Sequence, residues 1–260
     1  MSASLARVRA IKTLRLLRHP PAWPVVGGGL RKGVFPSFEH ASVPFGSDFA
    51  TIFDVGASRG QFALFALWRF RSARLICFEP LPEAAAVASR VLPSERVELH
   101  NLALASSPGN VTLHVSAQDD SSSLLTIGPG QVNAFPGTHE DRHLTVKVDV
   151  LENYLRPDVV QTPCLMKIDV QGAELDVLRG AGSALDLVDE VLVELSFEEL
   201  YSGQPLAQEV ASYLGARDFG LVAITDVTTR PNGEPVQAEF LFRRRFDPST
   251  QLRMTRRNCL

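Results

Sequence analysis

The short apolar run Thr-Ile-Phe ends in Asp54, Gly56 and Gly60, and a second apolar run ends about 25 residues later in Glu79. β-branched and aromatic residues that stop at an acid and a glycine turn predict a strand, and the residues that follow have a helical pattern. The segment therefore predicts a first β-α-β unit, in which glycines let the backbone approach a ligand and the second acid holds a ribose. The dinucleotide fingerprint G-x-G-x-x-G is absent. A nucleoside without a pyrophosphate fits better, and S-adenosylmethionine is the obvious one.

The same alternation of strand and helix patterns continues along the chain and predicts a doubly wound α/β fold with a mostly parallel sheet. Two further segments alternate apolar and polar residues and predict an antiparallel pair, at 110–115 and 143–150. Strands are expected near 51–55, 74–78, 97–104, 165–170, 188–195, 221–225 and 238–243, with helices at 61–71, 84–91, 173–187 and 206–215.

The 260 residues are enough for one large α/β domain, and we expect it to span residues 46–246. Residues 1–45 are expected to form a basic N-terminal helix and a Pro/Gly-rich linker, and residues 247–260 a basic tail. The spacing of apolar residues and arginines predicts an amphipathic helix at 3–18. Docking on the domain or on a second subunit, contact with an anionic membrane surface, and nucleic-acid binding all remain open for it, and so does a homo-oligomer.

The cysteine pattern and the lengths of the apolar runs indicate in which cellular compartment the protein is expected. Cys77, Cys164 and Cys259 show no C-x-x-C spacing, and their odd number argues against a disulfide framework. No apolar run approaches the roughly 18–20 residues of a membrane span, and no signal peptide is visible. We therefore expect a cytoplasmic protein.

One motif competes with these expectations. His139-Glu140-Asp141-Arg142-His143 matches H-E-x-x-H, the zinc protease signature. That chemistry needs both histidines on one helical face. Here a Pro-Gly pair precedes the motif and an alternating strand pattern follows it, so no helix fits and no metal site is expected. His139 and His143 are expected either to touch substrate or to be ordinary solvated histidines.

Residues 116–138 interrupt the regular pattern with many Ser, Gly, Pro and Asp residues. Long structureless insertions in compact domains are usually functional or disordered. We interpret the segment as an active-site lid or substrate loop, with simple surface disorder as the alternative.

Four acids fall at the ends of predicted strands, namely Asp54, Glu79, Asp169 and Glu194. Ligands of open α/β sheets bind at the carboxyl ends of strands, and buried acids are uncommon without a partner. The four together predict a polar site at this edge of the sheet.

Six short blocks of the sequence stand out together. They are Asp-Val-Gly-Ala-Ser-Arg-Gly (54–60), Phe-Glu-Pro (78–80), Asn-Leu-Ala-Leu (101–104), Lys-Ile-Asp-Val-Gln-Gly-Ala-Glu (167–174), Gly180 and Val-Glu-Leu-Ser (193–196). With these blocks the chain resembles the FkbM family of S-adenosylmethionine-dependent methyltransferases over roughly residues 50–245. Ser58 stands where this family usually has Asn, and Gln171 where it frequently has Glu.

The resemblance implies a class I methyltransferase fold, which is Rossmann-like, with helices on both faces and an antiparallel last strand. It also implies O-methylation of a sugar or polyketide-type hydroxyl. Asp54 is expected to receive the ammonium group of the cofactor directly or through water, and Glu79 to accept both ribose hydroxyls. The expected cofactor-binding residues are Asp54, Gly56, Ala57, Ser58, Gly60, Glu79, Pro80, Asn101, Ala103 and Asp169.

Methyl transfer from a sulfonium needs an aligned acceptor, and a hydroxyl acceptor also gains from a base. Asp169 is the first candidate base, because the loop after the fourth strand faces the departing methyl group. Lys167 either orients that acid or binds an anionic substrate, or it pairs with Asp169 for structural reasons alone. Glu194 is the second candidate base, and Glu174 is expected to act structurally at a helix start.

Other functions remain as alternatives to an O-methyltransferase that acts on a small molecule or glycan. A nicotinamide dehydrogenase is disfavoured by the missing fingerprint. A cofactor-binding protein without turnover, or a methyltransferase of a macromolecule such as RNA, stays open. The RNA alternative depends on the basic termini alone, so no nucleic-acid partner is expected.

Overall fold

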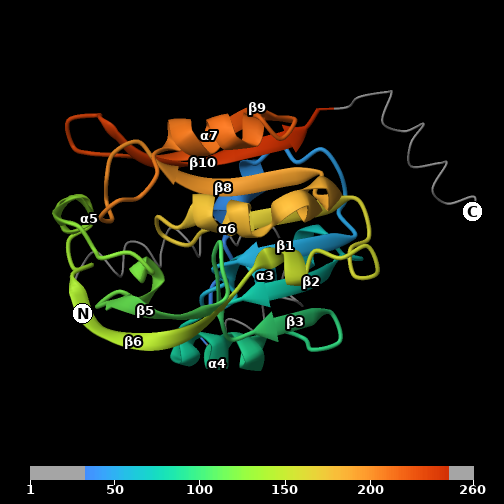
Figure 1. Cartoon of the computed structure of the whole chain (residues 1–260), viewed down its shortest axis with the longest axis horizontal. Coiled ribbons are helices and arrows are strands. Elements are labelled where there is room, and N and C mark those ends of the chain that lie inside the picture. Colours follow the sequence, from blue (N-terminus) through green and yellow to red (C-terminus); the bar gives the residue numbers. More distant parts are fainter. Residues whose placement is uncertain (1–32, 246–260) are drawn as a thin grey trace, which may run out of the picture.

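The computed structural model describes residues 33–245 and arranges them around a seven-stranded sheet (Figure 1). Its strand order is β3-β2-β1-β7-β8-β10-β9. All neighbours from β3 to β8 are parallel, whereas β10 runs antiparallel to β8 and to β9. The predicted mostly parallel sheet with an antiparallel last strand is confirmed. The strands are β1 (Thr51–Val55), β2 (Arg74–Phe78), β3 (Val97–His100), β7 (Cys164–Ile168), β8 (Glu190–Ser196), β9 (Phe219–Thr229) and β10 (Pro235–Arg244).

Helices cover both faces of the sheet, because side chains alternate in direction along each strand. Ile52 and Leu165 belong to a core cluster with α3 and α4 on one face. Their neighbours Phe53 and Met166 belong to a second cluster with α6 and α7 on the other face. The doubly wound arrangement is therefore confirmed. The helices are α3 (Gln61–Arg69), α4 (Pro82–Val91), α6 (Glu174–Gly180) and α7 (Ala207–Gly215).

Residues 34–45, which we assigned to the linker from the sequence, pack on the α3 side of the sheet. The 3₁₀ helix η2 (Phe38–Ser42) places the Phe38 ring against Phe65 and Trp68 of α3, with centroid distances of 6.1 and 5.1 Å. Buried aromatic pairs of this kind contribute beyond their buried area. The segment is therefore anchored in the core of the domain.

A second sheet has three strands in the order β4-β6-β5. The predicted antiparallel pair is confirmed, since β5 (Gly109–Ser116) and β6 (Glu140–Asp149) pair over almost their whole lengths. The strand β4 (Ala103–Leu104) adds to β6 in parallel.

The single strand predicted at 97–104 is wrong, because β3 stops at His100 and the chain then leaves the main sheet. Asn101 provides the physical reason. Its side-chain amide donates to the carbonyl oxygens of Glu79 and Pro80, at 2.8 and 3.1 Å. This bond to the chain after β2 replaces the ladder hydrogen bonds that a longer strand would have made.

Residues 116–138 fold into short elements, so the interpretation as plain surface disorder is wrong. They contain the 3₁₀ helix η3 (Asp119–Ser121) and α5 (Pro129–Ala134). Backbone bridges join Ser123 to His114 and Ile127 to Tyr201.

The helix predicted at 173–187 is divided into α6 and the 3₁₀ helix η5 (Gly182–Leu187). Gly182 has φ 53°, a left-handed conformation that an α-helix cannot include. Such a residue ends the helix at the point where the sequence pattern alone continues.

None of the helices between residues 33 and 245 is long and apolar enough to cross a membrane. The predicted basic helix at 3–18 and the tail at 247–260 lie outside the described residues.

Gly180 at the end of α6 gives a test of this packing. A Cβ atom there would overlap the carbonyl oxygen of Ala105, with no torsional freedom to relieve the clash. We expect Gly180→Ala to lower the free energy of unfolding by about 1–3 kcal/mol, as overpacked sites do. Urea denaturation measures the change.

Gly215 is the matched control, because it ends α7 and a Cβ atom there would meet nothing within 4 Å. Gly215→Ala should leave stability unchanged or raise it by up to about 1 kcal/mol. Equal stability of the two variants would contradict the close approach of α6 to the chain after β4.

Candidate active site

A cavity of about 350 Å³ opens at the carboxyl ends of the parallel strands. Ligands of open α/β sheets bind at this edge, and the volume lies within the range of small-molecule sites. The wall includes residues from the ends of β1, β2 and β7, from β8 and β10, from residues 37–40, and from residues 119–124.

The turn after β1 brings backbone close to the cavity. Gly56 and Gly60 have φ values of 83° and 91°, which glycine adopts without strain. A Cβ atom at Gly56 would overlap the carbonyl oxygen of Asp169, so the tips of β1 and β7 approach closely only with glycine there. The amides of Gly56 and Ala57 both donate to the carbonyl of Phe78, at 3.0 and 2.9 Å, which ties the turn to β2.

Glu79 lies directly after β2, and two backbone amides hold its carboxylate. The amide of Ser58 donates to one oxygen at 2.7 Å, and the amide of Leu81 donates to the other at 2.8 Å. Burial raises the pKa of Glu79 to about 7, although both hydrogen bonds oppose this shift. Each carboxylate oxygen has two lone pairs, so both oxygens can accept a further hydrogen bond from a ligand.

Lys167 is only 4% exposed and lies between two carboxylates. Its Nζ is 3.1 Å from Oδ2 of Asp169 and 4.0 Å from Oδ1 of Asp54, which is its register partner on β1. Burial lowers the pKa of Lys167, but the two acids outweigh burial, and the net pKa is raised. The lysine is therefore charged, and it counts as a buried ion-pair partner rather than a free cation.

The pKa values of the two acids beside Lys167 are shifted in opposite directions. Burial raises the pKa of Asp54 to about 6, although Lys167 opposes this. Neither carboxylate oxygen of Asp54 has a hydrogen-bond partner within residues 33–245. Burial also acts on Asp169, but Lys167 and the amide of Gln171 outweigh it and lower the pKa of Asp169.

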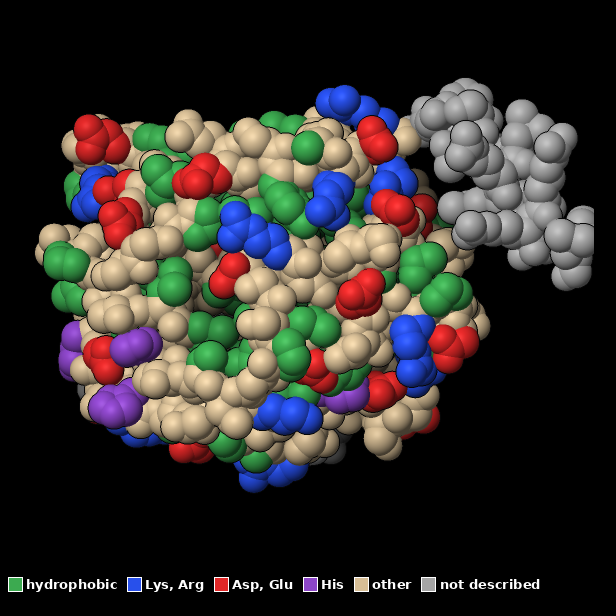
Figure 2. Space-filling view, in the orientation of Figure 1, with side chains coloured by type: hydrophobic (Ala, Val, Ile, Leu, Met, Phe, Trp, Pro, Cys, Tyr) green, Lys and Arg blue, Asp and Glu red, His purple; other side chains and the backbone are tan. Residues whose placement is uncertain are grey.

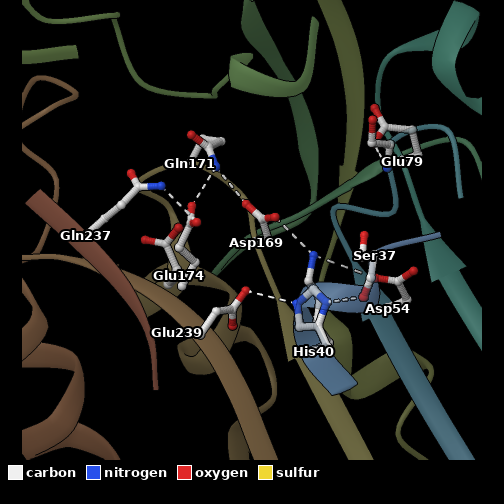
Figure 3. A network of polar contacts seen from close by, with 12 residues as sticks. Ser37, His40, Asp54, Glu79, Asp169, Gln171, Glu174, Gln237 and Glu239 are labelled. Atoms are coloured by element: carbon white, nitrogen blue, oxygen red, sulfur yellow. Dashed lines mark hydrogen bonds and ion pairs between the residues drawn. The ribbon is translucent and has the colours of Figure 1, made fainter. Parts of the chain in front are cut away.

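Gln171 joins two acids with one amide group (Figure 3). Its Nε2 donates to Oδ1 of Asp169 at 2.7 Å and to Oε2 of Glu194 at 3.0 Å. Gln237 donates to the other oxygen of Glu194 at 2.8 Å. Burial and the charge of Asp169 raise the pKa of Glu194 well above its ordinary value. Both oxygens of each acid are thus occupied, since Lys167 holds the second oxygen of Asp169.

Most of the residues expected from the sequence do line this one cavity, but three do not. Asp54 is fully buried and is not part of the wall. Gly60 lies at the start of α3, and Asn101 braces the backbone after β2. The expected residues that line the wall are Gly56, Ala57, Ser58, Glu79, Pro80, Ala103, Lys167, Asp169 and Glu194.

Glu174 does not line the cavity. It begins α6 and its carboxylate accepts the amide of Gly172 at 2.8 Å. Burial raises its pKa to about 7 although this bond opposes the shift. This is the structural role expected of it at a helix start.

Our sequence analysis missed His40, Glu239 and Gln61, which also line the cavity. His40 sits on the short η2 and has no local sequence signal. Glu239 could have been found, because it is an acid within the apolar strand pattern Ala-Glu-Phe-Leu-Phe of β10.

The H-E-x-x-H motif lies where β6 begins, so its histidines are not on a helix. Histidine side chains gather around an acid over β5 and β6 on the face shown in Figure 2. Glu140 is 2.9 Å from Nδ1 of His114 and 3.7 Å from Nδ1 of His143. Neither His139 nor His143 of the motif is part of the cavity wall, and neither is His114.

Comparison with known proteins agrees with this geometry. The model of the Methyltransferase FkbM domain family matches residues 54–221. A protein named 2-O-methyltransferase NoeI from Sinorhizobium fredii is 29% identical over 179 residues, which cover 66% of this chain and 73% of that protein. Methyltransferase 1 from Beauveria bassiana is 31% identical over 193 residues, which cover 64% of this chain and 72% of that protein.

Two solved structures show a more distant similarity. Magnesium protoporphyrin IX methyltransferase from Synechocystis PCC 6803, with bound SAM, has a TM-score of 0.39 and 9% identity, and covers 75% of this chain and 69% of its own. The 1,6-didemethyltoxoflavin-N1-methyltransferase of Burkholderia thailandensis has a TM-score of 0.41 and 14% identity, and covers 95% of this chain and 92% of its own. The fold itself is established by the strand order and the antiparallel β10. With the family model matching well over half of its length, the chain belongs to the FkbM family of S-adenosylmethionine-dependent methyltransferases.

Proposed function

We propose that the protein transfers the methyl group of S-adenosylmethionine to a hydroxyl group of a small molecule or glycan. The observation that carries the proposal is a single cavity with two different halves. Glu79 and the glycine turn form one half, and the acids at the ends of β7 and β8 form the other. The printed name of the relative NoeI, a 2-O-methyltransferase, supports a hydroxyl as the acceptor.

The residues of the first half fit the cofactor. Glu79 keeps lone pairs for two ribose hydroxyls while backbone amides fix its orientation. The glycine turn and Ala57 are proposed to border the methionine portion, and Ala103 the adenine. Asp54 lies beneath the wall, so we propose that a contact with the ammonium group runs through water.

The second half is proposed to position the acceptor. S-adenosylmethionine supplies an electrophilic methyl group on a sulfonium that leaves without protonation. Alignment of the acceptor oxygen can then contribute up to about 7–11 kcal/mol. Asp169, Lys167 and Glu194 are the proposed catalytic group, because they line the second half of the cavity. The bond from Lys167 to Asp169 and the bonds from Gln171 to both acids fix their positions.

The other expectations about partners and location stay predictions. The basic segment that motivated RNA or membrane contact lies outside the described residues. Cys77 and Cys164 are free and buried, in agreement with the reducing cytoplasm that we propose. A cofactor-binding protein without turnover is distinguished from an enzyme by measured methyl transfer.

Glu79→Ala tests the cofactor half. We expect it to weaken S-adenosylhomocysteine binding by about 10²- to 10⁴-fold, because it removes two hydrogen bonds to a charged group, which contribute roughly 1.5–3 kcal/mol each. Isothermal calorimetry measures the dissociation constant directly. Glu83→Ala is the control, since Glu83 is an exposed acid at the start of α4 that does not line the cavity. An unchanged dissociation constant for Glu79→Ala, or no saturable heat with wild-type protein, would reject the proposal.

The raised pKa of Glu79 makes a second, pH-dependent prediction. Two hydroxyl donors favour the ionised carboxylate, so ligand binding should lower a pKa that is about 7 in the free protein. Binding of S-adenosylhomocysteine should therefore release a proton near pH 7, and affinity should fall as the pH drops below 7.

Calorimetry in buffers of different ionisation enthalpy measures this proton release. Asp54 and Glu174 also titrate near this range, so the Glu79→Gln variant isolates the contribution of Glu79. The same proton release in wild type and Glu79→Gln would show that another group is responsible.

A further inference from the structure

β9 forms one edge of the seven-stranded sheet, at the top of Figure 1, and β3 forms the other edge. Residues 219–229 of β9 make ladder hydrogen bonds with β10 and no backbone hydrogen bond with any other part of the chain that the structure describes. An edge strand of this kind presents a row of unpaired N–H and C=O groups along its outer side. Another strand can therefore add to the sheet at β9.

The side chains of β9 are apolar where they face solvent. Of the six large hydrophobic side chains that are exposed between residues 33 and 245, four belong to this strand. They are 40–52% exposed, and they are Leu221, Val222, Ile224 and Val227. A fifth, Phe197, has its ring 5.7 Å from that of Phe240, which is the register partner of Ile224. The exposed apolar surface is thus concentrated at this one edge, and such a concentration marks an interaction site.

The two edges of the sheet differ in their protection against pairing. Natural proteins protect an edge by making it short, by placing charges or proline on it, or by bulges. β3 is four residues long, and its Glu98 is ion-paired with Arg74 at 2.7 Å. β9 is eleven residues long and contains one charged residue, Asp226. Its register shifts against β10 are its one protective feature, so β9 is the less protected edge of the two.

The charges at the two ends of β9 are opposite in sign. Arg245 lies beside the start of the strand, since its Nε would be 3.3 Å from a Cβ atom at Gly220. Asp226 lies toward the other end and is exposed. Neither Arg245 nor Asp226 has an ion-pair partner among the described residues. Each charge is therefore available to a molecule that binds along this edge.

Both charges lie on the α3 side of the sheet. Gly220 is the register partner of Arg243, whose guanidinium donates to the carbonyl oxygen of Pro44 at 3.1 Å. Pro44 belongs to the segment that packs on the α3 side. Asp226 lines the cavity together with residues 37–40 of the same segment. A strand that pairs with β9 can therefore meet both charges on one face.

A second copy of β9 fits these features better than an unrelated peptide does. Two copies of one strand that pair antiparallel are related by a two-fold axis, and the result is a closed dimer. With the axis perpendicular to the sheet, corresponding faces lie on the same side. The Asp226 end of each copy then meets the Arg245 end of the other. An acidic or basic peptide would find one attractive and one repulsive charge on this edge, whereas a copy pairs both charges at once.

We infer that the protein forms a two-fold symmetric dimer, in which the β9 strands of two copies pair antiparallel and join the two sheets into one. The exposed apolar side chains of β9 are buried in the interface, and Asp226 pairs with the partner's Arg245. Asp226 and Thr228 also line the cavity, so the interface borders the half that is proposed to position the acceptor. The inference does not depend on the proposed function.

Sedimentation equilibrium of the full chain between about 1 and 100 µM measures the association. We expect a mass of twice 28.4 kDa at the upper end of this range. Ile224→Lys should raise the dissociation constant of the dimer by about 10²- to 10⁴-fold, because symmetry removes two apolar side chains from the interface for each substitution. The urea midpoint of this variant should stay close to that of the wild-type monomer, since Ile224 is 45% exposed there.

Two valines of similar exposure give a matched control. Val222 on β9 is 40% exposed, and Val111 on β5 is 38% exposed. Val222→Lys should weaken the dimer in the same direction as Ile224→Lys. Val111→Lys makes the same change away from β9 and should leave the dissociation constant within about twofold of the wild-type value.

Exchange of the two charges tests the antiparallel arrangement. Asp226→Arg and Arg245→Asp should each weaken the dimer by about 10-fold, because each variant places like charges together twice across the axis. The double variant Asp226→Arg, Arg245→Asp restores opposite charges and should return the dissociation constant close to the wild-type value. A double variant weaker than both single variants would overturn the pairing of these two ends.

The remaining outcomes concern the dimer and its surface. A monomer throughout the concentration range would overturn the dimer and would assign the edge to another occupant, such as a strand of a different protein. A dimer that is unaffected by Ile224→Lys and by Val222→Lys would overturn β9 as its interface. Calorimetry with S-adenosylhomocysteine is a separate measurement, so failure of the dimer and failure of the proposed function are distinguished.

Discussion

The buried ammonium group of Lys167 is the interaction on which the site depends. It lies between Asp54 of β1 and Asp169 at the end of β7, and removing one partner of such a buried pair typically costs about 3–5 kcal/mol. In the strand order, β1 and β7 flank the point where the connections reverse direction. Ligands of open α/β sheets bind at this switch point. The charge network and the close approach at Gly56 therefore hold together the two strands between which the cavity opens.

The two halves of the cavity are held by different kinds of hydrogen bond, from backbone amides in one and from side chains in the other. On the β2 side, backbone amides fix Glu79, and the shape of that half depends on main-chain geometry. On the β8 and β10 side, side chains hold one another, as Gln237 holds Glu194 and His40 holds Glu239. The shape of a half that backbone amides hold is little affected by side-chain substitutions. The shape of a half that side chains hold changes when one of them is substituted. This division agrees with the proposed assignment of the first half to the cofactor and of the second half to the acceptor.

The parts of the site that could be predicted are those with a local signal. An acid directly after a strand, as at Glu79, marks the ligand edge of a parallel sheet, and the glycine turn marks close backbone approach. His40 could not be found in this way, because its partner Glu239 is 199 positions away in the chain. The end of β3 was misjudged for a related reason. The hydrogen bond of the Asn101 side chain with Glu79 depends on how two strands pair, and no pattern within 97–104 encodes it.

The side-chain amide of Gln171 links Asp169 and Glu194 without adding a third negative charge on this side of the cavity. In the resemblance to the family, Glu is frequent at its position, and a carboxylate there would face both Asp169 and Glu194. Three adjacent acids would need additional protons or a cation, since like charges in a buried site raise one another's pKa. The amide instead gives one N–H to each acid, and the Tyr201 hydroxyl, 2.8 Å from Oε1 of Gln171, fixes its orientation. The two acids are thereby held by a neutral group that adds no further charge between them.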